Sequence, residues 1–131
     1  MRRAASAVVV IAALALALGG IASAHTKKFP TTVTIALQGS PTGDSFAGQV
    51  KSSLKKCKQN RKVLVYRQGA LVGQTKSDET GAWVLSLGGS FASPGKYTAV
   101  ALRKKYVKPG QKHICLKGTS PEFKITGGGG P

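Results

Sequence analysis

The sequence predicts an all-β protein, an antiparallel β-sandwich of seven to eight short strands that follows an N-terminal signal peptide. Beyond residue 24, no stretch keeps the 3.6-residue apolar period of an amphipathic helix. Instead, segments of alternating apolar and polar residues recur about every ten residues, and turn-forming Gly, Pro, Asp and Ser separate them. A length of 131 residues fits one such domain and is too short for a multi-domain enzyme.

The first 24 residues have the composition of a secretory signal. Arg2 and Arg3 precede an apolar run over 4–18, and Ala22-Ser23-Ala24 supplies the small residues of a cleavage site. We therefore expect export and cleavage near Ala24, which leaves the protein secreted or associated with the cell envelope. Retention as an anchor is the open alternative, although the strongly apolar part, 7–18, is short for a bilayer core of about 30 Å.

The predicted organisation has four parts: a signal peptide (1–24), a short flexible start (25–30), the β-sandwich (31–126) and a Gly-rich flexible tail (127–131).

The first half of the sandwich supplies four predicted strands. The two leading strands each place three apolar or small side chains on one face: Val33, Ile35 and Leu37 in 31–38, and Phe46, Gly48 and Val50 in 45–51. The segment 62–67 alternates in the same way, with Val63 and Val65 on one face. Gln68-Gly69 then predicts a two-residue hairpin turn into the strand 70–76.

Four more strands are predicted in the second half of the chain: 82–87, 96–102, 112–117 and 122–126. Asp78 and Gly81 suit a tight turn before the first of them. Trp83, the single tryptophan, is expected to anchor the core with its large ring. Ser93-Pro94-Gly95 breaks the chain before the strand that follows it.

The two cysteines, Cys57 and Cys115, are expected to form a disulfide. Without residues 1–24, Leu, Ile, Val and Phe make up about a fifth of the chain, a composition at which high net charge favours disorder. An even number of cysteines in an exported chain indicates a disulfide. A disulfide between Cys57 and Cys115 would close a loop of almost sixty residues, which stabilises a fold by about 4 kcal/mol in the chain-entropy treatment. Two free buried thiols are the alternative.

Four short motifs lie between residues 46 and 125: Phe46-x-Gly48-x-Val50-x-Ser52, Val63-x-Val65-Tyr66, Ser77-Asp78-x-x-Gly81-x-Trp83-x-Leu85 and Pro94-Gly95-x-Tyr97-x-Ala99. Together they resemble carboxypeptidase-regulatory-like domains, which are transthyretin-like (prealbumin-like) sandwiches of the Ig type in exported proteins. The resemblance implies an Ig-like, transthyretin-like fold and a non-catalytic module for adhesion, binding or structural spacing. The two cysteines and the very basic loops depart from the general family pattern.

The chain is strongly basic, with 20 Lys and Arg against 4 Asp and Glu and a net charge of +16. Residues 1–24 hold two arginines and no acidic residue, so the remainder carries +14. Four acidic residues leave little room for acid–base catalysis, and no serine is bracketed as in a nucleophile elbow. We therefore expect no enzyme activity, no catalytic residues and no cofactor.

The basic residues are expected to gather at one end of the sandwich. If each strand crosses it once, the segments 52–61, 77–81 and 103–111 meet at that end. Eight residues then form a predicted anion-binding patch: Lys55, Lys56, Lys58, Arg61, Arg103, Lys104, Lys105 and Lys108. The expected disulfide would tie these segments together, with Lys112 and Lys117 nearby.

Such a patch attracts polyanions through contacts that release counterions. The partners expected are anionic cell-surface polymers, with membrane head groups or non-specifically bound nucleic acid as further candidates, and Tyr106 is the one candidate stacking ring. Another extracellular protein, bound or inhibited through the same loops, is an alternative. A solvated basic surface without a specific ligand also stays open. No small-molecule substrate is evident.

A copper-binding protein is a further alternative. Cleavage after Ala24 would make His25 the mature N-terminus, and its amine and imidazole could bind one copper ion with His113 as a second ligand. Lys112 would repel a cation beside His113. Two cysteines are too few for a structural zinc site.

Overall fold

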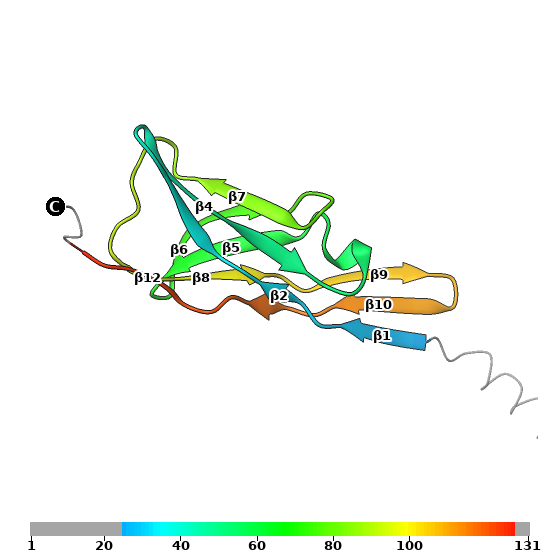
Figure 1. The fold of residues 1–131 in the computed structure, drawn as a ribbon. Coiled ribbons are helices and arrows are strands. Elements are labelled where there is room, and N and C mark those ends of the chain that lie inside the picture. The colour runs from blue at the N-terminus through cyan, green and yellow to red at the C-terminus, as the bar shows by residue number, and fades with distance from the viewer. Residues whose placement is uncertain (1–24, 128–131) are drawn as a thin grey trace, which may run out of the picture.

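The computed structural model describes residues 25–127, so the predicted signal peptide and the last four residues of the predicted tail lie outside the described residues. Over this range the chain forms twelve strands and one short 3-10 helix, and the predicted all-β sandwich is confirmed (Figure 1). No helix in 25–127 has the length and apolar character needed to cross a membrane. The elements are β1 (His25–Phe29), β2 (Thr32–Val33), β3 (Ala36–Ser40), β4 (Gly43–Lys51), η1 (Lys55–Cys57), β5 (Lys62–Arg67), β6 (Ala70–Lys76), β7 (Ala82–Ser86), β8 (Gly95–Ala101), β9 (Lys104–Lys108), β10 (Gln111–Cys115), β11 (Gly118–Thr119) and β12 (Phe123–Ile125).

Two antiparallel sheets make the sandwich. In the first, β4 pairs with β2 and β3 and also with β7. In the second, the order is β6-β5-β8, and both β11 and β12 pair with β8. The inward side chains of both sheets form one buried core: Val33, Phe46, Val50, Val63, Val65, Trp83, Tyr97, Ala99 and Ala101. These are the residues that the period-two alternation places on one face of each strand.

Aromatic rings fill the centre of this core. Trp83 is 2% exposed, which confirms its expected role as a core anchor. The rings of Phe46 and Tyr97 lie 4.6 Å apart between centroids. The Tyr97 hydroxyl donates to the carbonyl of Ser93, so its polar end is satisfied where the chain enters β8.

The predicted strand 31–38 is interrupted, and Gly48 is part of the reason. The structure divides this segment into β2 and β3, with Thr34 and Ile35 between them. A Cβ at Gly48 would lie 1.9 Å from the Thr34 carbonyl oxygen, so only glycine permits this approach of the two backbones. The Thr34 amide donates to Gln49, and the Thr34 hydroxyl accepts from the Gln49 amide.

The predicted hairpin turn and the predicted Asp78 turn are both present. Gln68 (φ 48°) and Gly69 (φ 86°) occupy the left-handed region and join β5 to β6 as a two-residue loop. In the turn before β7, the Asp78 carboxylate accepts from the Thr80 amide and hydroxyl and from the Ala82 amide. These bonds lower the pKa of Asp78, the bond from the Thr80 hydroxyl contributing most.

A third sheet, with the order β1-β10-β9, projects beyond the sandwich (Figure 1). It corrects two expectations. The segment 25–30 is not a flexible start, because His25–Phe29 is a strand parallel to β10. The segment 103–111 is not only a connection between strands, because it contains β9, which forms a hairpin with β10. The physical reason is that β10 has two hydrogen-bonding edges, and β1 and β9 satisfy both. We call these three strands the basic ribbon.

Candidate anion-binding surface

The disulfide fixes the basic ribbon to the sandwich. Cys57 at the end of η1 is bonded to Cys115 at the end of β10, which confirms the expected pair. Both residues are fully buried. The 3-10 helix therefore stands directly against the ribbon, although the two segments are 58 residues apart in the sequence.

Arg61 does not belong to the surface patch, and this prediction is wrong. Its side chain is 0% exposed, and its guanidinium donates to four groups inside the protein. The acceptors are the carbonyls of Leu102, Leu116 and Cys57 and the hydroxyl of Thr31, at 2.7–3.2 Å. Burial lowers the pKa of Arg61, but a guanidinium remains charged in proteins. A buried cation whose hydrogen-bond donors are all used inside the protein cannot bind an external ligand.

The register of the basic ribbon assigns its side chains to two faces. One face carries the cross-strand rows His25/Gln111/Lys108, Lys27/His113/Tyr106 and Phe29/Cys115/Lys104. This is the inner face, because Cys115 is bonded to Cys57 of η1. The outer face carries the rows Thr26/Lys112/Val107 and Lys28/Ile114/Lys105.

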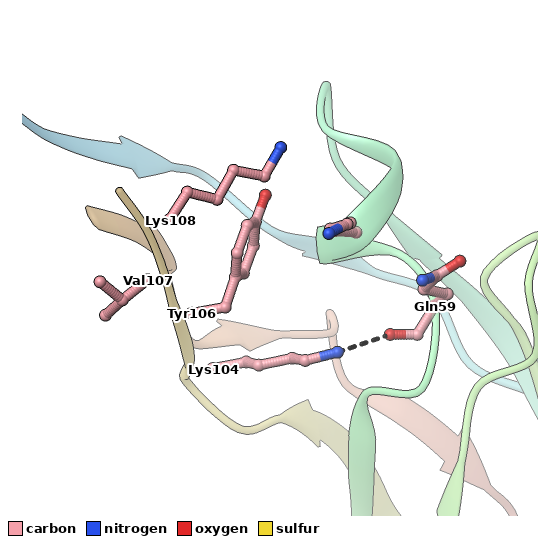
Figure 2. Close-up of a pocket in the computed structure, with 6 residues that line it drawn as sticks. Gln59, Lys104, Tyr106, Val107 and Lys108 are labelled. Carbon is pink, nitrogen blue, oxygen red and sulfur yellow. Dashed lines mark hydrogen bonds between the residues drawn. The ribbon is translucent and has the colours of Figure 1, made fainter. Parts of the chain in front are cut away.

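The inner face and η1 border an open hollow of about 320 Å³ (Figure 2). It is lined by Lys56, Gln59, Lys104, Tyr106, Val107 and Lys108. Lys104, Tyr106 and Lys108 point from β9 toward η1, while Val107 points away (Figure 2). The lining contains three lysines and no acidic residue.

Tyr106 holds a central place in this hollow. The Lys56 ammonium lies 5.1 Å from the centre of its ring, within cation–π range. The Tyr106 hydroxyl is 2.8 Å from Nδ1 of the buried His113, and the two rings meet edge to face. Burial raises the pKa of Tyr106, so the phenol stays neutral at physiological pH. The predicted stacking ring is thus occupied by protein groups.

Lys104 is the most constrained lysine of the hollow. It is partly buried, and its ammonium donates to the Gln59 carbonyl at 3.3 Å. Its pKa is lowered, first by burial and then by the positive charges of Arg61 and Lys56. The cations at this end of the molecule therefore repel one another within the folded chain.

The other predicted patch residues divide between η1 and the ribbon. Lys55 and Lys56 belong to η1, and Lys58 follows it. Arg103 is exposed just before β9, and Lys105 points to the outer face, away from Lys104. Sequence reasoning missed Lys27 and Lys28 because 25–30 was expected to be flexible. The Lys27-Lys28 pair itself was the available signal.

The four acidic residues of the chain lie on other elements. Asp44 is in β4 and accepts from the Ala92 amide, and Glu122 precedes β12. Asp78 and Glu79 lie in the turn between β6 and β7. The ribbon and η1 contain no acidic residue.

The two histidines of the copper alternative differ in exposure and in their neighbours. His25 is exposed at the start of β1, opposite Gln111, whereas His113 is 8% exposed and opposite Lys27. Nδ1 of His113 is already bonded to Tyr106. Among residues 25–127, no group of three or more His, Cys, Asp or Glu could hold a metal ion.

Comparisons with known proteins add no relative. No protein-family model, no curated protein and no solved structure that was searched matches the chain. The functional argument therefore depends on the geometry and charge of this surface.

Proposed function

We propose that this chain is an exported, non-catalytic β-sandwich module that binds anionic polymers at the cell envelope or outside the cell. The observation that carries the proposal is the charge of the basic ribbon. Its three short strands contain six lysines and no acidic residue: Lys27, Lys28, Lys104, Lys105, Lys108 and Lys112. Lys55 and Lys56 of η1 add to the same end.

Export is supported by two features of the chain. The buried Cys57–Cys115 disulfide is typical of oxidising compartments, and the first 24 residues have the composition of a signal peptide. The resemblance to carboxypeptidase-regulatory-like domains supports a binding or spacing module without catalysis.

The mechanism of binding is electrostatic. Lysine ammonium groups on both faces of an exposed ribbon contact the charged groups of a polymer and displace its condensed counterions. Such binding is steeply dependent on salt and reads charge spacing more than chemical sequence. A partner recognised through an apolar interface would lose little affinity in salt.

The test compares two double variants that remove equal charge. Lys28→Gln/Lys105→Gln neutralises an exposed pair that flanks Ile114 on the ribbon. Lys96→Gln/Lys124→Gln neutralises an exposed cross-strand pair on β8 and β12 and serves as the control. Retention on heparin and on isolated anionic wall polymer is measured over a salt gradient.

We expect the ribbon variant to elute at clearly lower salt than the control. The log–log slope of its affinity against salt should fall by about 1 to 2, because two contacts are lost. Equal elution of the two variants would show that only total charge matters. Retention that does not change with salt would contradict the proposal and favour a protein partner.

A further inference from the structure

The hollow between η1 and β9 brings several cations together without a counter-ion. Lys56 comes from η1 and Lys104 and Lys108 come from β9, and the lining has no acidic residue. Gln59 adds an amide that can donate hydrogen bonds. An arrangement of this kind is electrostatically incomplete and is complementary to a bound anion.

Two of the three cations are held by contacts within the protein before any ligand arrives. The Lys56 ammonium lies over the Tyr106 ring, and a hydrogen bond between the Tyr106 hydroxyl and His113 fixes that ring. Lys104 is anchored by one bond to the Gln59 carbonyl, which leaves its other two N–H donors for a ligand. The disulfide holds η1 against the ribbon, so the distance across the hollow is set by a covalent bond. Pre-organisation of this kind reduces the entropy lost on binding.

The donors favour a tetrahedral oxyanion over a carboxylate. Arginine forks match the planar, two-oxygen geometry of a carboxylate, whereas lysines act as point charges and commonly bind phosphate. Lys56 of η1 and Lys104 of β9 border the hollow from two different elements, so their ammonium groups can contact different oxygens of one group.

We infer that the hollow between η1 and β9 binds a single phosphate group, either free or carried by a phosphate-containing polymer. The inference rests on the proposed function: if the basic end binds an anionic polymer, phosphate is the group of that polymer that the hollow binds. The rest of the ribbon contributes long-range attraction, and the hollow contributes a defined site. Lys104 is its central ligand.

Two single-lysine variants form a matched pair. Lys104→Gln removes a cation that points into the hollow (Figure 2), and Lys124→Gln removes an exposed cation of β12, outside the basic ribbon. The oxidised, exported protein is titrated with sodium phosphate at constant ionic strength, and binding is followed by amide chemical shifts. Sodium sulfate and sodium acetate are titrated in parallel.

We expect saturable phosphate shifts at Gln59, Lys104 and Tyr106. Lys104→Gln should weaken phosphate binding at least about tenfold, because a charge-assisted hydrogen bond is lost, while Lys124→Gln should change it less than about twofold. Acetate should bind more weakly than phosphate. Linear, non-saturating shifts, equal losses in the two variants, or acetate binding as strong as phosphate binding would each overturn the inference. Unchanged Trp83 fluorescence shows that the variants are folded.

Two further measurements make two distinctions. One distinguishes free phosphate from phosphate in a polymer, and the other distinguishes failure of this inference from failure of the proposed function. Binding of a glycerol phosphate polymer with the same Lys104 dependence assigns the group to a polymer, and saturation by inorganic phosphate alone assigns it to the free ion. If phosphate does not saturate but the Lys28/Lys105 double variant still loses polymer retention, the hollow is no site and the proposed function stands. If neither experiment gives the expected result, both proposals are wrong.

Discussion

Arg61 donates all five of its guanidinium N–H groups inside the protein. Its acceptors lie between consecutive strands: Thr31 between β1 and β2, Leu102 between β8 and β9, and Leu116 between β10 and β11. These are the three places where the chain passes between the sandwich and the basic ribbon. A single buried side chain therefore sets how the ribbon continues from the sandwich.

Replacement of Arg61 should be among the most destabilising changes in the chain. Arg61→Met buries no charge but leaves the carbonyls of Cys57, Leu102 and Leu116, the first buried and the others partly buried, without these donors. It should cost about 3–5 kcal/mol in the free energy of unfolding. Arg61→Lys should restore only part of this, because an ammonium has three donors and no planar fork. Urea denaturation followed by Trp83 fluorescence measures both.

Arg67 provides the control for this experiment. It is an exposed arginine whose guanidinium donates to the Pro94 carbonyl. Arg67→Met should cost less than about 1 kcal/mol, since its acceptor can turn to water. If the two Met variants lose similar amounts of unfolding free energy, the hydrogen bonds of Arg61 do not stabilise the fold more than those of an exposed arginine.

At the scale of elements, the basic ribbon depends on non-local ties. Its lysine-rich strands add few residues to the hydrophobic core. Only its inner face packs against η1. β1 contributes mainly exposed residues and is held by its parallel pairing with β10. The disulfide and Arg61 supply the attachments that apolar burial does not.

Loss of the disulfide should affect the ribbon before the sandwich. The Cys57→Ala/Cys115→Ala variant should lose about 4 kcal/mol of stability, because its unfolded chain is no longer restricted by the closed loop. In native-state hydrogen exchange, amides of β1, β9 and β10 should lose protection more than those of β5 and β8. Uniform loss over all strands would contradict this order, and it would indicate that ribbon and sandwich unfold as one unit.

At the scale of the whole molecule, the charge is unbalanced in amount and in place. Residues 25–127 carry 18 basic and 4 acidic side chains, and the acidic ones are absent from the ribbon and η1. Such a distribution destabilises the folded state through self-repulsion while it attracts polyanions. The same uncompensated cations that weaken the fold are the ones available to a ligand.

Stability should therefore rise with salt. Raising NaCl from about 10 mM to about 150 mM shortens the screening length from about 30 Å to about 8 Å and should raise Tm by several degrees. The Lys28→Gln/Lys105→Gln variant should show a smaller rise, because part of the repulsion is already removed. Differential scanning calorimetry measures both proteins, and a Tm that is constant or falls with salt would refute the idea of charge repulsion.

Local sequence patterns determined the sandwich and much of its chemistry. Alternation predicted β4, β5, β7 and β8 because one face of each of these strands packs on the core, and this burial leaves a period of two in the sequence. Gln68-Gly69 predicted its hairpin, because the left-handed conformation it needs is a property of those two residues. The same holds for Asp78, whose carboxylate bonds to amides within four residues. Two cysteines in a chain that was predicted to be exported were enough to expect their disulfide.

The tertiary structure alone decided the form of the basic end. The strand β1 has no apolar period, and it is a strand because the edge of β10, more than eighty residues away, offers it hydrogen bonds. Counting basic residues placed Arg61 with the lysines, but its burial depends on carbonyls from three distant crossings of the chain. The faces of β9 separate Lys104 from Lys105, and only the register and the disulfide show which face meets η1. Charge is a property of the sequence, whereas the direction in which each charge points is set by pairings between remote segments.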